Sequence, residues 1–355
     1  MFKFDFDLDD EADIISNDEQ LSPDEQTPNN KPTNVEIPLS QLVDALPAVI
    51  SYSPLSISLS SRPEPLRLAR RDLFDARFQL ISEDRDLQFF ETPSDLVPGV
   101  YEGGFKTWEC CLDLVDYMES NELAIVGEKV LEVGCGTAVP SMYLLQKALS
   151  FLAKTNCPPE TQLHLQDYNS SVLELVTLPN LLIAWYLSPT SALYLHNTER
   201  PDPSVPSEIS ITADLKSAFL SSLKQHNISL RFFSGPWEMF YPQKYDIILT
   251  SETIYRMASL PSLVHLLRTA CLGIRADSRN SENDCMRNPS LCLVAAKVVY
   301  FGVGGGVAEF TKIVEGDENK EKRGRVETVW ETKTGVKRRV LSVIWTALRY
   351  TGADS

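Results

Sequence analysis

Two glycines, Gly134 and Gly136, separate an apolar run from a helical pattern in the segment EVGCGTAVP at 132–140. Glycine lets a backbone turn sharply and approach a ligand closely, and the helix that follows offers N–H groups without partners. Position 139 holds valine, where a dinucleotide fingerprint places its third glycine, and no G-K-[ST] of a phosphate-binding loop follows. The turn therefore favours an adenosine-containing ligand that makes no phosphate contacts.

An acidic residue, Glu132, precedes the first glycine by two positions. A carboxylate there suits the cationic amine of a methionyl group, and a positively charged sulfonium ligand prefers an acidic site. We therefore expect Glu132, Gly134, Cys135 and Gly136 to bind the methyl donor S-adenosylmethionine. The alternative is a turn with a structural role only.

Polar or aromatic residues follow the next two strand patterns. Asp167 ends the second pattern, where a carboxylate is placed to accept hydrogen bonds from ribose hydroxyls. Asn169 could bind the donor or cap the helix that follows. After the third pattern comes a turn with Gly235 and Trp237, whose indole could lie against an adenine ring.

The fourth strand pattern ends in SETIY at 251–255. The end of this strand flanks the topological switch point, where open α/β sheets bind their ligands. Glu252 and Tyr255 are therefore our candidates for holding the methyl acceptor. No N-P-P-[YF] stands here, which disfavours methylation of amides or bases.

The elements that must position these residues alternate along the chain. Strand patterns cover 129–135, 162–168, 230–234, 245–250 and 291–299, and helical patterns cover 140–153, 170–187 and 262–272. This alternation predicts a parallel sheet covered on both faces. Two last strands, around 327–332 and 340–348, predict the antiparallel hairpin that distinguishes a methyltransferase sheet from a plain dinucleotide-binding one. We expect the polar insertions at 154–161, 188–228 and 276–289 to be surface loops.

The chain divides into three parts by composition. Residues 1–30 hold ten acidic residues and one lysine, so we expect 1–35 to be a disordered acidic tail. Residues 36–99 contain the strand-like pieces ISYSPLSISLS and ARFQLIS and should form an N-terminal extension packed on the core. Residues 100–355 form the predicted methyltransferase domain.

Charge and cysteine content limit the partners and the compartment. The net charge of −16 disfavours direct DNA binding and suits a basic protein partner, although acidity also serves solubility alone. No apolar run reaches the roughly 18 residues that a membrane span needs, and the acidic N-terminus is unlike a targeting peptide. Seven cysteines without a C-x-x-C pair indicate no disulfide framework and no metal site. We therefore expect a protein of the cytoplasm and nucleus.

Together these elements resemble the Rossmann-like, seven-stranded methyltransferases, whose α/β sheet has the order 3-2-1-4-5-7-6. A narrower similarity, to the eukaryotic histidine protein methyltransferases, covers nearly the whole chain except the polar insertions. It rests on the segments FKFDF at 2–6, RDLFDAR at 71–77, GGFKTWEC at 103–110, the glycine turn, QDYN at 166–169, GPW at 235–237, SETIY at 251–255 and YFGVGGG at 300–306.

The resemblance implies methylation of one histidine, at Nε2, in a large-subunit ribosomal protein. It also implies donor contacts from Trp108, Glu109, Gly134, Asp167, Asn169, Trp237 and Ser251. Neutral imidazole, with a free pKa near ~6.5, is already nucleophilic at neutral pH. No strong base is therefore required, and Glu252 or Tyr255 would only have to orient the ring through its other nitrogen.

Two alternatives stay open at this point. A protein-lysine methyltransferase of the same fold would also suit Glu252 and Tyr255. A non-catalytic ribosome-assembly factor could keep the donor pocket as a fold element, although the intact Glu132, glycine pair and Asp167 argue against a decayed pocket.

Overall fold

A computed structural model describes residues 33–82, 103–152, 158–192, 201–273, 289–300, 302, 304–316 and 323–345. The predicted acidic tail lies almost wholly outside the described residues, as do most of the insertion at 276–289 and the segment FKFDF. In the described part of the chain, no helix is both long and apolar enough to span a bilayer.

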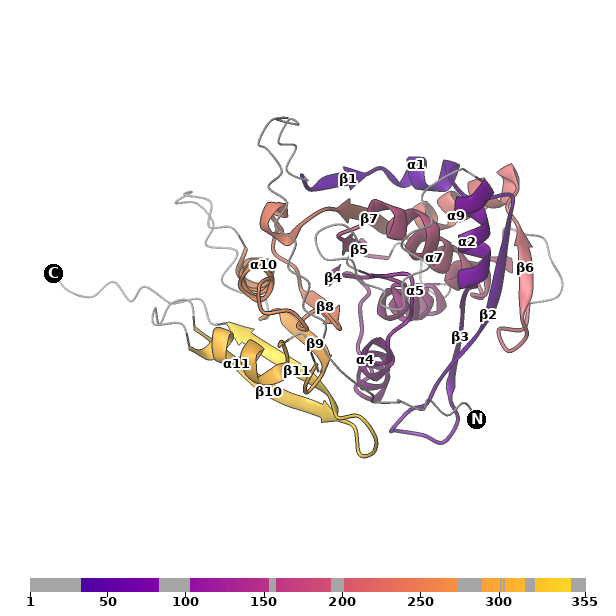
Figure 1. Ribbon diagram of the computed structural model, residues 1–355. Helices are drawn as coiled ribbons and strands as arrows, with labels where there is room; N and C mark the ends of the chain where they lie inside the picture. Colours follow the sequence, from indigo (N-terminus) through magenta and orange to yellow (C-terminus); the bar gives the residue numbers. More distant parts are fainter. Residues whose placement is uncertain are drawn as a thin grey trace, which may run out of the picture. The chain divides into compact units, whose positions relative to one another are not determined.

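The centre of the fold is an eight-stranded sheet in the order β1-β7-β5-β4-β8-β9-β11-β10 (Figure 1). Its strands are β1 (Val35–Ile37), β4 (Lys129–Val133), β5 (Thr161–Asp167), β7 (Ile228–Ser234), β8 (Ile247–Ser251), β9 (Leu291–Lys297), β10 (Gly324–Glu331) and β11 (Arg338–Trp345). Five neighbouring strands, β7, β5, β4, β8 and β9, are parallel. The hairpin β10–β11 joins this sheet through β11, which pairs antiparallel with β9. Without β1 this is the predicted order 3-2-1-4-5-7-6, which is confirmed.

The eighth strand comes from the N-terminal extension. β1 pairs antiparallel with β7, with Val35 opposite Ser234 and Ile37 opposite Phe232. An exposed edge of a sheet invites unwanted pairing with other chains. The short β1 covers that edge of the methyltransferase sheet, which the sequence pattern did not predict.

Helices cover the two faces of the sheet (Figure 1). The side chains buried on the two faces form two separate hydrophobic clusters. On one face lie α4 (Glu109–Ser120), α5 (Val139–Leu152), α7 (Leu178–Tyr186) and α9 (Ala213–Gln225), and on the other α10 (Leu260–Leu272) and α11 (Val307–Glu315). The alternation of side chains along β4 explains the split, because Val130 faces the first cluster whereas Leu131 faces the second.

The extension also forms a second, three-stranded antiparallel sheet, in the order β3-β2-β6. Its strands are β2 (Val49–Ile57), β3 (Leu66–Arg71) and β6 (Ser207–Ser210). β6 comes from the middle of the insertion at 188–228, so this insertion ties the extension to the core. The short helix α1 (Leu39–Asp44) connects β1 to this sheet.

Two predictions about these regions are wrong. The piece ARFQLIS lies in a helix, α2 (Leu73–Ser82), in which Ala76 and Gln79 are buried at a helical spacing. The insertion at 188–228 is no continuous loop, because it holds β6 and α9. Helix α9 begins at the Thr212 cap, whose hydroxyl accepts a hydrogen bond from Leu215 N at 3.1 Å.

The helix predicted at 170–187 is interrupted. It consists of α6 (Ser170–Val172), the π-helical turn η1 (Leu173–Thr177) and α7. Pro179, in the first turn of α7, has no N–H for a helical hydrogen bond, and this explains a break at its N-terminal side. Such π-turns are rare and occur often at functional sites.

Candidate functional site

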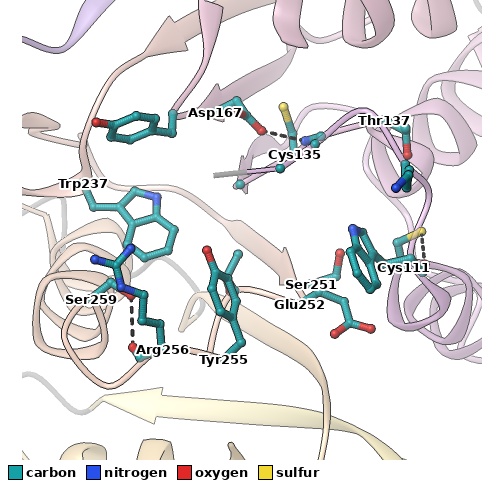
Figure 2. A pocket seen from close by; sticks show the side chains of 18 of the residues that line it. Cys111, Cys135, Thr137, Asp167, Trp237, Ser251, Glu252, Tyr255, Arg256 and Ser259 are labelled. Carbon is teal, nitrogen blue, oxygen red and sulfur yellow. Dashed lines mark hydrogen bonds between the residues drawn. The ribbon is translucent and has the colours of Figure 1, made fainter. Parts of the chain in front are cut away.

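A cavity of about 500 Å³ opens at the carboxyl ends of the parallel strands, where α/β sheets bind their ligands. Figure 2 shows the side chains that line it. They lie at or after the ends of β4, β5, β7, β8 and β9. The segment that leads into α4 adds Gly103, Gly104, Lys106 and Trp108, and α4 itself adds Cys111. Nine predicted residues line it: Trp108, Gly134, Cys135, Gly136, Asp167, Trp237, Ser251, Glu252 and Tyr255.

The glycine turn forms one wall of this cavity. Gly134 and Gly136 have φ angles of +61° and +50°, which favour glycine. A Cβ atom at Gly134 would lie 2.7 Å from Thr253 Cγ2, and one at Gly136 would lie 3.2 Å from Gly104 O. The turn is therefore packed closely against the segments that carry the rest of the site, and side chains there would intrude.

Asp167 stands at the end of β5 with its carboxylate fixed by the backbone. Its Oδ2 accepts a hydrogen bond from Gly136 N at 2.9 Å, and its Oδ1 accepts one from Asn169 N at 3.0 Å. Two carboxylate oxygens offer about four acceptor positions. The side chain can therefore hold the glycine turn and still accept hydrogen bonds from ribose hydroxyls.

The indole of Trp237 projects into the cavity (Figure 2). Its Nε1 donates to Gln166 Oε1 at 3.0 Å, and Gln166 Nε2 donates to Gly235 O at 2.8 Å. These two bonds fix the plane of the ring. A fixed aromatic face fits an adenine base.

Four predicted binding residues, Glu109, Glu132, Asn169 and Gly235, lie beside the cavity and are not in its lining. Glu132 is buried behind the turn and accepts hydrogen bonds from the backbone N and the hydroxyl of Ser141, at the start of α5. Burial raises the pKa of Glu132 to about 8 although these bonds lower it. The carboxyl group thus holds α5 to β4, and its contact with the donor's amine stays a prediction.

The other three of these residues have structural partners. Asn169 Nδ2 donates to Gly103 O at 3.1 Å. A Cβ atom at Gly235 would lie 2.7 Å from Thr33 O, in the extension. Glu109 Oε2 pairs with Lys297 Nζ at 3.3 Å.

The second half of the cavity is built around Glu252. This residue has a left-handed φ of +56°, a strained conformation that is frequent at functional sites. The Tyr300 hydroxyl donates to Glu252 Oε2 at 2.6 Å, and Lys297 Nζ lies 3.6 Å from Oε1. Of the groups described, none donates a hydrogen bond of standard geometry to Oε1, although this atom is buried.

The glycine run at 304–306 supports this half from behind. Gly305 N donates to Tyr255 O at 3.0 Å, and a Cβ atom at Gly305 would lie 2.3 Å from the carbonyl carbon of Tyr255. The backbones of the two segments are thus in direct contact. Tyr255 extends from the supported segment into the cavity (Figure 2).

Sequence reasoning missed several lining residues. Tyr300, Gly103 and Gly104 belong to segments that carried the resemblance but received no role, while Thr137, Thr253, Arg256 and Lys297 had no individual signal. The apolar run of β9 ends in Lys297. A charged residue at the end of a buried strand could have been predicted as a site residue. Among the side chains that the structure describes, no group of three or more His, Cys, Asp or Glu could hold a metal ion.

Comparison with known proteins adds the family. No protein-family model matches the chain. Histidine protein methyltransferase 1 of Saccharomyces cerevisiae is 32% identical over 301 residues, a match that covers 78% of this chain and 76% of that protein. The protein of the same name from Schizosaccharomyces pombe is 34% identical, with 75% and 78% covered. The homolog from Bos taurus is 35% identical over 64% of this chain and 52% of its own length. This chain therefore belongs to the histidine protein methyltransferase family.

Proposed function

We propose that this protein transfers a methyl group from S-adenosylmethionine to a histidine imidazole nitrogen of a protein substrate. The family supports the reaction, and one feature of the cavity carries the assignment of the acceptor site. Glu252 Oε1 is buried at the switch point of the sheet and accepts no standard hydrogen bond from the described residues. It can therefore accept the N–H of a substrate ring.

The donor half of the cavity consists of Gly134, Gly136, Asp167 and Trp237. The glycine turn would allow close approach of the methionyl part, Asp167 would accept hydrogen bonds from the ribose, and the Trp237 ring would hold the adenine. When bound, the donor would supply a methyl group on its sulfonium sulfur. The lone pair of the imidazole nitrogen forms the new N–CH₃ bond. The electron pair of the broken S–CH₃ bond stays on sulfur, which becomes a neutral thioether.

The acceptor half consists of Glu252, Tyr255, Lys297 and Tyr300. We add Trp108, for which the resemblance implies a donor contact, because its ring contacts the ammonium group of Lys297. A neutral imidazole that donates Nδ1–H to Glu252 Oε1 directs the lone pair of Nε2 away from the carboxylate. Alignment of this lone pair and exclusion of water are the main contributions required from the protein. After methyl transfer the ring is an imidazolium cation that still carries a proton on Nδ1. Glu252 is the base beside this proton and accepts it.

The substrate and the compartment are further parts of the proposal. The charge of −16 suits a basic substrate, for which association is steered by charge. A large-subunit ribosomal protein, methylated at Nε2 in the cytoplasm or nucleus, satisfies this requirement.

The experiment is transfer of radiolabelled methyl groups to proteins of the large ribosomal subunit, followed by acid hydrolysis. We expect label in methylhistidine. Label in methyllysine would favour the lysine methyltransferase, and donor binding without transfer would favour an assembly factor.

Variants of the acceptor half test the roles of its residues. We expect Glu252→Gln to lower turnover by about a hundredfold and Tyr255→Phe by less, with donor affinity unchanged, because both residues contact the acceptor. If both variants kept wild-type turnover and donor affinity, the assignment of the acceptor half would be wrong.

A further inference from the structure

Lys297 is a charged residue of the acceptor half to which methyl transfer itself assigns no role. It is the last residue of β9, and its side chain lines the cavity at 21% exposure. Its Nζ lies 3.3 Å from Glu109 Oε2, 3.6 Å from Glu252 Oε1 and 4.9 Å from the centre of the Trp108 ring. Two carboxylates and an indole face therefore surround one ammonium group.

This ammonium group keeps its charge at neutral pH. Burial lowers the pKa of Lys297, but the carboxylates of Glu252 and Glu109 outweigh burial and hold the pKa above its ordinary value. The group also contacts the Trp108 face in the geometry of a cation–π interaction. Lys297 is thus held in place by three attractive contacts.

The same three contacts are those that a lysine substrate would use. A carboxylate and an aromatic face are the usual partners of an ammonium group. Here both already contact Lys297, although its Nζ, 3.6 Å from Glu252 Oε1, donates no standard hydrogen bond to that atom. A second ammonium group beside Glu252 would lie within about 5 Å of a like charge, where repulsion is strong. A neutral imidazole suffers no such repulsion and needs only one acceptor, which Glu252 Oε1 provides.

We propose that Lys297 restricts the acceptor half to a neutral imidazole by occupying the place in which the ammonium group of a lysine substrate would bind. This inference rests on the proposed function and names a determinant of its specificity. Lys297 contributes through its positive charge and its position. An arginine would retain the charge, whereas a neutral side chain of similar length would leave Glu252 and Trp108 open to another cation.

The test compares the wild-type protein with Lys297→Met, Lys297→Gln and Lys297→Arg, all in the full chain. Each is incubated with large-subunit ribosomal proteins and radiolabelled S-adenosylmethionine at pH ~8.5, where part of the lysine is neutral. After hydrolysis, methylhistidine and methyllysine are measured separately. Calorimetric binding of the donor shows that each variant is folded, and Lys297→Gln replaces Lys297→Met if the latter fails this check.

We expect the wild type and Lys297→Arg to label histidine almost exclusively, with the same low ratio of methyllysine to methylhistidine. The two neutral variants should raise the ratio of methyllysine to methylhistidine by about tenfold to a hundredfold. A merely structural role for Lys297 would lower both products together and leave their ratio unchanged.

Three results would overturn the inference. Neutral variants that bind the donor and keep the wild-type ratio refute the role of Lys297 alone. A ratio of methyllysine to methylhistidine in Lys297→Arg that is raised as much as in the neutral variants refutes the role of its charge. A wild-type protein that binds the donor and labels no histidine refutes the proposed function, and the inference with it.

Discussion

The contact between Gly134 and Thr253 gives a sharp prediction about how the two halves of the cavity depend on each other. An alanine at Gly134 would have to adopt a φ of +61°, and its Cβ would lie 2.7 Å from Thr253 Cγ2. The left-handed backbone costs about 1–2 kcal/mol, and overpacking adds about 1–3 kcal/mol. We therefore expect Gly134→Ala to lower the free energy of unfolding by about 2–5 kcal/mol.

A second substitution separates these two contributions. Thr253→Ser removes the methyl group that meets the new Cβ and keeps the hydroxyl, which lies 2.7 Å from Thr250 Oγ1. We expect the double variant Gly134→Ala/Thr253→Ser to recover about 1–3 kcal/mol relative to the sum of the single variants. Gly335→Ala is the matched control, because Gly335 has a φ of +76° and a Cβ there would meet nothing within 4 Å.

The assay is urea unfolding of the four proteins and the control, together with calorimetric titration of S-adenosylmethionine. Donor affinity should fall in Gly134→Ala and recover in part in the double variant, because the turn lines the cavity in which we propose that the donor binds. Additivity within about 0.5 kcal/mol, or a loss in Gly134→Ala no larger than in Gly335→Ala, would refute the reasoning.

Two further predictions concern groups buried behind the cavity. Burial raises the pKa of Glu132 to about 8 from 4.5, so the folded protein binds more protons than the unfolded chain between these values, and stability should fall as pH rises across this window. Urea unfolding at several pH values should show that the free energy of unfolding falls less steeply with pH in Glu132→Gln than in the wild type. The same slope in both proteins would contradict this prediction. Arg71→Met should lower the free energy of unfolding by about 3 kcal/mol in the same assay, because Asp75 and the carbonyl of Leu175 lose a hydrogen-bond donor whose side chain is fully buried. A loss below about 1 kcal/mol would contradict this, and Arg62→Met, which removes a half-exposed ion pair with Glu119, is the control.

The sequence was most informative where one local pattern has one structural solution. β4, β5 and β8 are buried along almost their whole length, and the alternation of strand and helix patterns indicates central parallel strands. The order of the seven core strands was implied by the resemblance. The glycine turn was equally clear, because two glycines so close together favour a turn with left-handed φ angles, here +61° and +50°. Residues at the ends of these strands, such as Asp167 and Glu252, were then placed by the topology.

The prediction failed where partners distant in sequence decide the outcome. ARFQLIS alternates like a strand, yet burial of Ala76 and Gln79 against the core makes it helical. The pattern around Glu132 gave no indication that the hydroxyl and backbone N–H of Ser141, nine residues later, donate hydrogen bonds to its carboxyl group. Lys297 acquires its environment only from Glu109 and Glu252, which lie on other elements.

The N-terminal extension has a closer connection to the donor half than its place in the sequence suggests. Arg71 N donates to Asn180 Oδ1 at 2.7 Å, and Asn180 Nδ2 donates to the carbonyl of Thr137, a cavity residue, at 2.8 Å. β3 is therefore joined to the glycine turn through a single buried amide side chain.

A second route runs through the π-turn. Pro179 has no N–H to donate to Leu175 O, the carbonyl four residues earlier, and this carbonyl accepts a hydrogen bond from Arg71 Nη1 at 2.7 Å. At the end of the same turn, the Thr177 hydroxyl donates to Gly136 O at 2.7 Å. Arg71 of the extension thus donates the hydrogen bond that Pro179 cannot, and Thr177 of the π-turn donates one to the glycine turn. A methyltransferase domain that began at residue 100 would lack Arg71. Both routes that support the glycine turn begin at this residue.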